Sequence, residues 1–421
     1  MSKNAASNVL VFNPGSNSLK FEIVASESTD RNVVLGRKLL SGVVEPIGPG
    51  AKFSLLDGRK KRNEENFAVT DHGDAARKIL ARVDTGIASE SGIGNKSEID
   101  IIGHRVVHGG ERYSEPVLID EGVVRDIEKL EELAPLHNAG ALGVIRATRT
   151  EVRHSTPHVA VFDTAFHRTI PDFARFYAIP WELTQRHGIQ RFGFHGISHH
   201  YLMLRYAELT GTPVEKTNIV TLHLEGGSSA AAIVDGKSID TSMGFTPLEG
   251  LIMGTRSGDI DPALVGFLAR REGLDLAGIE KLLNKQSGLL GVSGRSQDTR
   301  ELIPHQSEKR VGLALDMFAY RVRKYIGAYL AAAGNTSAIV FGGGIGENTP
   351  VVRQRVCTGL ERLGLHFDPD RNAATIDRFG KISRDDSALH AFVIPTEEGL
   401  MIAHQATLCC AATLSAGTIR S

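Results

Sequence analysis

Two arginines lie in glycine-rich segments of the chain. Arg105 follows the apolar pair Ile101 and Ile102, and Arg256 lies in the segment 253–259. A guanidinium group binds a carboxylate or a phosphate through two parallel hydrogen bonds. Either arginine alone is more often part of a structural ion pair, whereas the two together could clamp an anionic substrate.

Two carboxylates follow apolar runs that are typical of buried strands. Asp163 comes directly after residues 158–162, and Glu398 follows residues 393–396. Carboxylates at strand ends are natural ligands for magnesium, with water completing the coordination shell. Surface carboxylates are abundant, so neither residue identifies a metal site alone.

Histidines are concentrated in the segment 191–200. His199 and His200 point to different faces of a helix and have no acidic residue nearby, which disfavours a zinc site. His195 lies just before a helix predicted to begin near Ile197. This position suits an imidazole, neutral or charged, that donates to a phosphoryl group.

Two tight turns rich in glycine and serine are candidate phosphate sites, because such turns expose backbone N–H groups and hydroxyls. Residues 13–18 join predicted strands 9–12 and 19–24, and residues 225–229 join predicted strands 218–224 and 230–234. Each turn alone is more often only a hairpin, and neither is a Walker A loop.

A third glycine segment, residues 342–346, follows a predicted strand at 338–341 and precedes a helix predicted from about Thr349. It could approach a nucleotide closely, but Thr349 replaces the third glycine of the dinucleotide fingerprint, which disfavours a dinucleotide fold. A simple packing turn remains the alternative.

Short β-branched runs alternate with helical patterns between 45 glycines and 15 prolines, which is typical of the α/β class. The length of 421 residues predicts two or three domains, and the repeated hairpin suggests two similar halves. Helices are predicted at 263–271 and 307–333. Strands and loops are expected over residues 26–70. Near one face of the second helix lie Leu313, Met317, Tyr320 and Ile326.

The charges are balanced, with 48 Lys and Arg against 49 Asp and Glu and a net charge of −1. Nucleic acid is therefore not expected as a partner, because phosphate contacts need a basic face. The 3 cysteines provide neither a disulfide framework nor metal-type spacing. No signal peptide or apolar segment long enough to span a membrane is evident. These features predict a cytoplasmic protein that does not associate with a membrane.

Taken together and in this order, the motifs resemble the acetate kinase family of acyl-phosphate-forming kinases. The resemblance runs through nearly the whole chain and is weakest in residues 26–70 and at the C-terminus. It is carried by the segments 103–110, 134–138, 162–167, 192–199, 241–256 and 344–348.

The resemblance implies an α/β fold of two ribonuclease-H-like domains, each a mixed sheet flanked by helices, with an active-site cleft between them. Residues 1–164 with 397–421 would form the N-terminal domain, completed by the C-terminal helix. Residues 165–396 would form the nucleotide-binding and dimerisation domain. A homodimer is implied as well.

The family's site residues carry over by motif position. Asp163, His195, Arg256 and Arg105 would be catalytic, with His137 supporting the transition state and Asn13 and Glu398 holding Mg²⁺ or, in its place, Mn²⁺. Val107, Leu136, Phe194 and Pro247 would line a small apolar pocket for the methyl group of acetate. The nucleotide-binding set would be Lys20, His223, Leu224, Glu225, Gly226, Gly227, Asp298, Thr299, Arg300, Gly344, Ile345, Gly346, Glu347 and Asn348.

Three positions depart from the family pattern. The second turn reads His-Leu-Glu-Gly-Gly over 223–227 where the family typically has His-Leu-Gly-Asn-Gly, so a carboxylate stands where phosphate is expected. Pro14 removes one N–H from the first turn. Thr299 replaces an often aromatic residue near the adenine. We expect these changes to affect the phosphoryl donor and adenine affinity.

The predicted activity is acetate kinase, with ATP as co-substrate and in-line phosphoryl transfer to acetate. Two alternatives keep the fold: a kinase for propionate, butyrate or another short acid, and a pyrophosphate-dependent variant. A third alternative is a non-catalytic regulatory protein that binds nucleotide.

Overall fold

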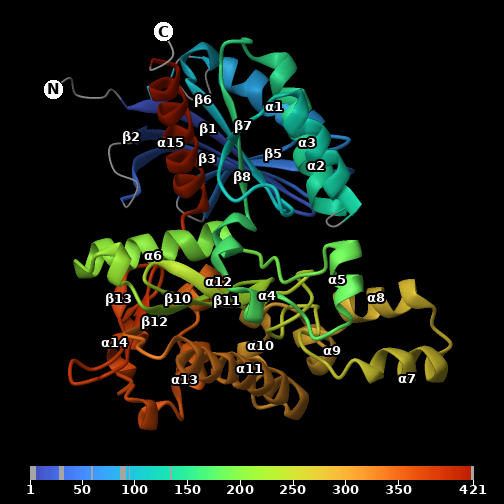
Figure 1. Cartoon of the computed structure of the whole chain (residues 1–421), viewed down its shortest axis with the longest axis vertical. Helices are drawn as coiled ribbons and strands as arrows, with labels where there is room; N and C mark the ends of the chain where they lie inside the picture. Colours follow the sequence, from blue (N-terminus) through green and yellow to red (C-terminus); the bar gives the residue numbers. More distant parts are fainter. Residues whose placement is uncertain are drawn as a thin grey trace. The chain divides into compact units, whose positions relative to one another are not determined.

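The computed structural model describes residues 6–27, 33–57, 60–85, 92–93, 95–132 and 135–418. The chain forms two compact units (Figure 1). The first comprises Met1–Ala165 and Glu397–Ser421, and the second comprises Phe166–Thr396.

The first unit contains a mixed sheet in the order β5-β4-β3-β2-β1-β6-β8-β7. β1 pairs with β2 antiparallel and with β6 parallel, and β6 pairs parallel with β8. The carboxyl ends of β1, β6 and β8 therefore meet at one edge of this sheet. The strands are β1 (Ser7–Pro14), β2 (Leu19–Glu27), β3 (Leu35–Glu45), β4 (Lys52–Asp57), β5 (Lys60–Asn66), β6 (Ile101–Val106), β7 (Val117–Leu118) and β8 (His158–Phe162).

Helices cover both faces of this sheet. Ile102 of β6 belongs to the same buried cluster as Val144, whereas an ideal Cβ on the neighbouring Gly103 would lie 3.0 Å from the Ile402 side chain. Successive strand residues point to opposite faces, so α3 and α15 pack on opposite sides. The helices are α1 (His72–Asp84), α2 (Glu121–Lys129), α3 (Pro135–Glu151) and α15 (Glu398–Thr418).

The second unit repeats this plan with the order β11-β10-β9-β12-β14-β13. A β9–β10 hairpin is followed by β12 and β14, both parallel to β9, as β6 and β8 are to β1. The two similar halves suggested by the repeated hairpin, and the α/β class predicted from alternating strand and helix patterns, are therefore confirmed. The strands are β9 (Ile219–Leu224), β10 (Ser228–Val234), β11 (Lys237–Thr241), β12 (Ala338–Gly342), β13 (Gly380–Lys381) and β14 (His390–Val393).

The long helix α11 supplies much of the core of the second unit. Phe318 and Val322 are fully buried in one cluster with Val220 of β9 and Ile339 of β12. The helices of this unit are α4 (Asp172–Arg175), α5 (Trp181–His187), α6 (Gly196–Thr210), α7 (Ala263–Glu272), α8 (Leu276–Lys285), α9 (Gly288–Ser293), α10 (Thr299–Leu302), α11 (Lys309–Ala333), α12 (Gly343–Asn348), α13 (Pro350–Cys357) and α14 (Pro369–Ala374).

The predicted helix 307–333 is confirmed, but its apolar face was assigned wrongly. Leu313, Met317 and Tyr320 are 50%, 38% and 63% exposed, whereas Ile326 is fully buried. The first three follow each other at helical spacing, but Ile326 is displaced from them around the helix by about 120–180°. Leu313, Met317 and Tyr320 therefore form an exposed apolar stripe.

The glycine segment after β12 also differs from its prediction. A helix begins at Gly343, ahead of the expected start near Thr349. Gly343 has φ +73°, and an ideal Cβ there would lie 2.7 Å from the Leu224 carbonyl oxygen. Only glycine fits such a close approach between backbones. The strands expected within residues 26–70 are present as β3, β4 and β5.

A buried carboxylate lies beside the start of α15. The Oε1 atom of Glu22 lies 3.4 Å from Nζ of Lys38, which also pairs with Glu397. An ideal Cβ on Gly399 would lie 2.1 Å from Glu22 Oε2, so this glycine makes room for the carboxylate. Burial raises the pKa of Glu22 to about 7 although Lys38 opposes the shift.

Glu22→Gln should therefore stabilise the protein at alkaline pH. The pKa of Glu22 is higher in the folded state than the ordinary value of 4.5, so its contribution to stability falls as pH rises from 4.5 to 7. We expect the free energy of unfolding at pH 8 to rise by about 1–2 kcal/mol and the melting temperature by a few degrees. At pH 5 both increases should be clearly smaller.

The matched control is Glu64→Gln. Glu64 is an exposed carboxylate of the same sheet that pairs with Lys52 at 2.7 Å. It should give no gain at pH 8. Equal changes in melting temperature for Glu22→Gln at both pH values would contradict the assignment.

Candidate active site

Four predicted site residues form one hydrogen-bonded cluster in the first unit. Arg105 donates from Nη2 to Asp163 Oδ2 at 2.9 Å and from Nη1 to Asn13 Oδ1 at 3.3 Å. Asn13 donates in turn from Nδ2 to Glu398 Oε2 at 2.8 Å. Residues distant in sequence therefore converge at one edge of the sheet.

The parallel strands explain this convergence. Asn13 lies near the end of β1, Arg105 near the end of β6, and Asp163 directly after β8. The Asp163 N–H donates to the Val106 carbonyl at 2.9 Å, which continues the β6–β8 ladder and fixes the direction of the chain. Glu398 enters the cluster as the first residue of α15.

The cluster is partly removed from solvent. The Asp163 side chain is 1% exposed and that of Arg105 is 13% exposed. A buried carboxylate needs a counter-charge, and Arg105 supplies it. The same guanidinium also donates to the Pro14 carbonyl at 3.3 Å, so the first tight turn is attached to the cluster.

The donor atoms of this cluster suit a hard divalent cation. Asp163 and Glu398 offer carboxylate oxygens, and Asn13 offers an amide oxygen, which are the ligand types that Mg²⁺ prefers. Across the residues that the structure describes, no group of three or more His, Cys, Asp or Glu side chains could enclose a metal ion. Magnesium needs no such cage, because phosphates and water fill most of its shell.

His195 is the centre of a second group of residues, in the second unit. It precedes α6 with φ +57°, a backbone conformation that is unusual for a residue other than glycine. Its Nδ1 atom lies 2.8 Å from Ser229 Oγ. Its ring packs against His223 with 4.4 Å between the centroids. The ring is therefore held from two sides.

Gly227 lies beside both His195 and Arg256. An ideal Cβ at this position would lie 3.4 Å from Nε2 and Cε1 of His195 and 3.6 Å from Nη1 of Arg256. The second turn therefore brings the imidazole edge and the guanidinium into one neighbourhood. Burial lowers the pKa of Arg256, yet a guanidinium remains charged at neutral pH.

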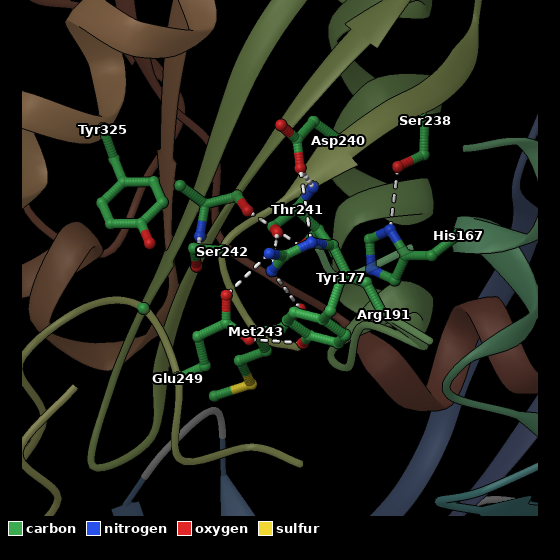
Figure 2. Close-up of polar contacts among 12 residues, drawn as sticks. His167, Tyr177, Arg191, Ser238, Asp240, Thr241, Ser242, Met243, Glu249 and Tyr325 are labelled. Carbon is green, nitrogen blue, oxygen red and sulfur yellow. Dashed lines mark hydrogen bonds and ion pairs between the residues drawn. The ribbon is translucent and has the colours of Figure 1, made fainter. Parts of the chain in front are cut away.

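Arg191 holds residues 241–249, the segment that precedes Arg256 along the chain (Figure 2). Arg191 donates to the carbonyls of Thr241 at 3.0 Å and Met243 at 3.3 Å, and pairs with Glu249 at 2.6 Å. Arg256 itself donates to the Pro247 carbonyl at 3.0 Å. A buried network of this kind restricts where the loop can move.

Glu225, the unusual residue of the second turn, lies close to His223. Its Oε2 atom is 3.5 Å from His223 Nε2, and its side chain is 53% exposed. The exposed side weakens this ion pair through solvent screening. The carboxylate has a cationic partner whenever His223 is protonated.

The other predicted residues of the first unit lie on the same sheet and helices. Lys20 is an exposed residue of β2 that pairs in register with Asn13. Val107 is buried directly after β6. His137 is half-buried on α3, and the neighbouring Leu136 has a side chain outside the described residues.

Several nucleotide-site candidates of the second unit have clear structural roles. Glu347 is fully buried and accepts from the Thr396 N–H at 3.0 Å. Asp298 caps α10 and pairs with Arg300 at 2.6 Å. Phe194, Leu224 and Thr299 are buried, and Pro247 is half-buried. The segment from Gly344 to Asn348, which includes Ile345 and Gly346, forms most of α12.

Three residues beside His195 were missed by the sequence analysis. His199 was considered only as a zinc ligand, and Ser229 and Thr221 were not considered individually. A signal was present, because His199 follows His195 by four residues, about one helical turn. The pairing of Ser229 with His223 on β10 and β9 completes the neighbourhood.

Known proteins match this chain over nearly its whole length. The model of the acetokinase family matches residues 8–404 of the chain. The acetate kinase of Solibacter usitatus is 46% identical over 405 residues, covering 96% of this chain and 98% of the relative.

Solved structures are similar over the same span. The acetate kinase of Porphyromonas gingivalis has a TM-score of 0.87 at 40% identity and covers 96% of this chain and 100% of its own. A propionate kinase from Francisella tularensis has a TM-score of 0.84 at 36% identity, covering 96% of this chain and 99% of its own. Within the described part of the chain, no helix is both long and apolar enough to cross a membrane.

Proposed function

The chain belongs to the acetokinase family, and on that premise we propose that it transfers the γ-phosphoryl group of ATP to acetate, giving acetyl phosphate and ADP, and catalyses the reverse reaction. The cluster that joins Arg105 to Asp163 and Asn13 to Glu398 is the single observation in the structure that best supports this proposal. It combines a guanidinium for an anionic substrate with oxygen ligands for a cation.

The reaction needs little covalent chemistry from the protein. A carboxylate is already a nucleophile, so positioning and charge neutralisation can supply the catalysis. In this proposal Arg105 and Arg256 hold the carboxylate and the phosphoryl group in transfer. Asp163 orients the Arg105 guanidinium through its hydrogen bond. His195 donates to the phosphoryl oxygens, and His137 helps to stabilise the transition state.

Asn13 and Glu398 would hold Mg²⁺, with Asp163 nearby. Bound magnesium neutralises charge on the phosphate oxygens and orients them. The protein's part is to fix the oxygen donors, and the hydrogen bond between Asn13 and Glu398 at 2.8 Å does so. Mn²⁺ has similar ligand preferences and would substitute for it.

The nucleotide would contact Lys20 and the second glycine turn, together with the segments 298–300 and 344–348. Leu224, Thr299 and Glu347 are buried, so their contribution is to shape the backbone around the nucleotide. The exposed Lys20 would supply positive charge.

The test is formation of acetyl phosphate by purified protein with acetate, ATP and magnesium, trapped with hydroxylamine. Robust ATP-dependent turnover is expected. Turnover with pyrophosphate and not with ATP would support the pyrophosphate-dependent alternative. In that alternative the turn that contains Glu225 disfavours nucleotide binding. Tight nucleotide binding in calorimetry without any transfer would support the regulatory alternative.

Val107→Ala should shift acid preference toward propionate. Val107 is buried, 5% exposed, and directly follows β6, the strand that carries Arg105. We propose that its side chain contacts the methyl group of acetate. Removing two methyl groups makes room for one methylene, worth about 1–3 kcal/mol. The ratio of kcat/KM for propionate over acetate should rise about tenfold; an unchanged ratio would exclude this contact.

The protein is proposed to be a homodimer. The exposed apolar stripe of α11 supports this, because Leu313, Met317 and Tyr320 follow each other at helical spacing on the exposed side. Exposed apolar patches frequently mark protein interfaces. Tyr320→Glu should convert the dimer into monomer in light scattering at micromolar concentration. Glu301→Gln, at an exposed position on α10, is the control and should leave the mass unchanged.

We propose that the protein acts in the cytoplasm. Its three cysteines, Cys357, Cys409 and Cys410, are all free thiols. Free thiols are typical of reducing compartments, where the predicted substrates are also available.

A further inference from the structure

A chain of buried side chains leads from His195 into the core of the second unit. Ser229 Oγ lies 2.8 Å from His195 Nδ1 and 2.8 Å from His199 Nε2. On the other side of that ring, His199 Nδ1 lies 2.8 Å from Thr221 Oγ1. The order is therefore Thr221, His199, Ser229, His195.

All members except His195 are fully buried. Thr221, His199 and Ser229 are each 0% exposed. Thr221 and His223 lie on one face of β9, and Ser229, which pairs in register with His223, lies on the same face of β10. His195 and His199 approach this face from α6, one helical turn apart. The strands β9 and β10 and the start of α6 thus hold the four side chains of this hydrogen-bonded series in place.

The burial also determines what the chain can donate and accept. Complete burial, followed by the nearby His167 and His223, holds the pKa of His199 well below its usual value. A neutral imidazole carries one N–H and one bare nitrogen. Hydroxyls can donate or accept, so Thr221 and Ser229 can satisfy His199 in either tautomer. The Nδ1 atom of His195 therefore has a partner whether or not it carries a proton.

We propose that Ser229 and His199 are positioning residues for His195. Their hydrogen bonds hold Nδ1 of His195 and fix the plane of its ring, so that the Nε2 edge stays beside Gly227 and Arg256. This inference rests on the proposed function, in which Nε2 donates to the transferring phosphoryl group.

The other charged and titratable groups around His195 come from three elements. His223 of β9 packs against its ring, and Glu225 of the second turn lies 3.5 Å beyond His223. Arg256 approaches from its loop on the side of Gly227. His223 packs against the ring and Arg256 lies on the side of the Nε2 edge, whereas Ser229 is hydrogen-bonded to Nδ1. Replacing Ser229 therefore changes the Nδ1 side specifically.

The test is Ser229→Ala, with kcat and both Michaelis constants measured from pH 6 to 8.5. We expect kcat at pH 8.5 to fall about 10–100-fold, by analogy with the loss of groups that orient metal-binding histidines. The Michaelis constants should change less than about threefold, because Ser229 positions a group that acts mainly in the transition state.

The loss should shrink several-fold at pH 6. When the single proton of a neutral His195 is on Nε2, its bare Nδ1 accepts from the Ser229 hydroxyl, and Ser229→Ala removes that donor. A protonated His195 has N–H groups on both nitrogens and donates from Nε2 whatever Nδ1 contacts. A defect that is equally large at every pH would indicate a merely structural role and overturn the inference.

Two buried residues of the same unit provide matched controls. Ser383 is 0% exposed and lies 3.3 Å from the imidazole of His390. Ser383→Ala should keep kcat within about twofold.

Thr221→Val should lower kcat by about threefold. Its control is Thr217→Val, which removes a buried hydroxyl that donates to the Pro213 carbonyl at 3.0 Å and should leave kcat unchanged.

A second measurement is independent of turnover. Histidine labelled with ¹⁵N reports tautomer and protonation through the shifts of its ring nitrogens, and His195→Gln identifies the His195 signals. Ser229→Ala should move the Nδ1 signal of His195 strongly, and Ser383→Ala should not. Unchanged His195 signals would overturn the inference even in a protein that forms acetyl phosphate. Absent turnover beside shifted signals would instead contradict the proposed function.

Discussion

Asp163→Asn should lower kcat for acetyl phosphate formation by about 1000-fold. Asparagine keeps the size of the side chain and removes its charge. The Asp163 carboxylate is 1% exposed and accepts from Arg105 at 2.9 Å. In the variant the neutral amide no longer balances the charge of the partly buried Arg105 guanidinium. The ion pair that orients Arg105 is therefore lost. Magnesium should also bind more weakly, because a carboxylate close to the proposed Asn13 and Glu398 ligands becomes neutral.

Asp126→Asn is the matched control in the same unit. Asp126 also pairs with an arginine, Arg112, and accepts from the Tyr113 hydroxyl at 2.8 Å, but Arg112 is 73% exposed. Exposed pairs contribute little, so activity should stay within about twofold. A variant Asp163→Asn that kept a tenth of the wild-type kcat would remove Asp163 from the proposed machinery.

The sequence revealed part of the first cluster, because the strand ends that carry Arg105 and Asp163 are visible in it. An apolar pair shortly before Arg105 and an apolar run directly before Asp163 marked two strands, and the carboxyl ends of parallel strands share one edge of a sheet. The bond between Asn13 and Glu398 joins residues 385 positions apart. Spacing alone does not predict such a contact, and only the family resemblance placed the two together.

The chain behind His195 was beyond sequence reasoning for a different reason. Whether Ser229 faces the same side as His223 depends on the β9–β10 register, and a shift of one residue would turn it to the opposite face. The orientation of Glu225 likewise depends on a side-chain rotamer. On α11, helical spacing identified an apolar stripe but did not reveal which side meets the core, because apolar residues occur on both sides.

Arg256→Lys should lower kcat by about 100-fold and make activity sensitive to alkaline pH. Lysine keeps a positive charge but loses the planar fork that can bind a carboxylate or phosphate through two bonds. The Arg256 side chain is partly buried, and this burial lowers its pKa. A lysine there should have a pKa below its ordinary value, because burial disfavours the charged ammonium group. As pH rises through that value the ammonium loses its proton, so kcat of the variant should fall further while wild-type kcat does not.

Arg371→Lys separates this expectation from a general effect of the substitution. Arg371 donates to the Ser383 carbonyl at 2.9 Å, as Arg256 does to that of Pro247, but its side chain is 39% exposed and pairs with Asp385. A lysine at 371 stays charged, so neither kcat nor its pH profile should change. If Arg256→Lys matched the wild type at pH 7 and declined only at alkaline pH, the charge of Arg256 alone would suffice. A loss that was the same at every pH would instead assign the whole effect to the shape of the guanidinium.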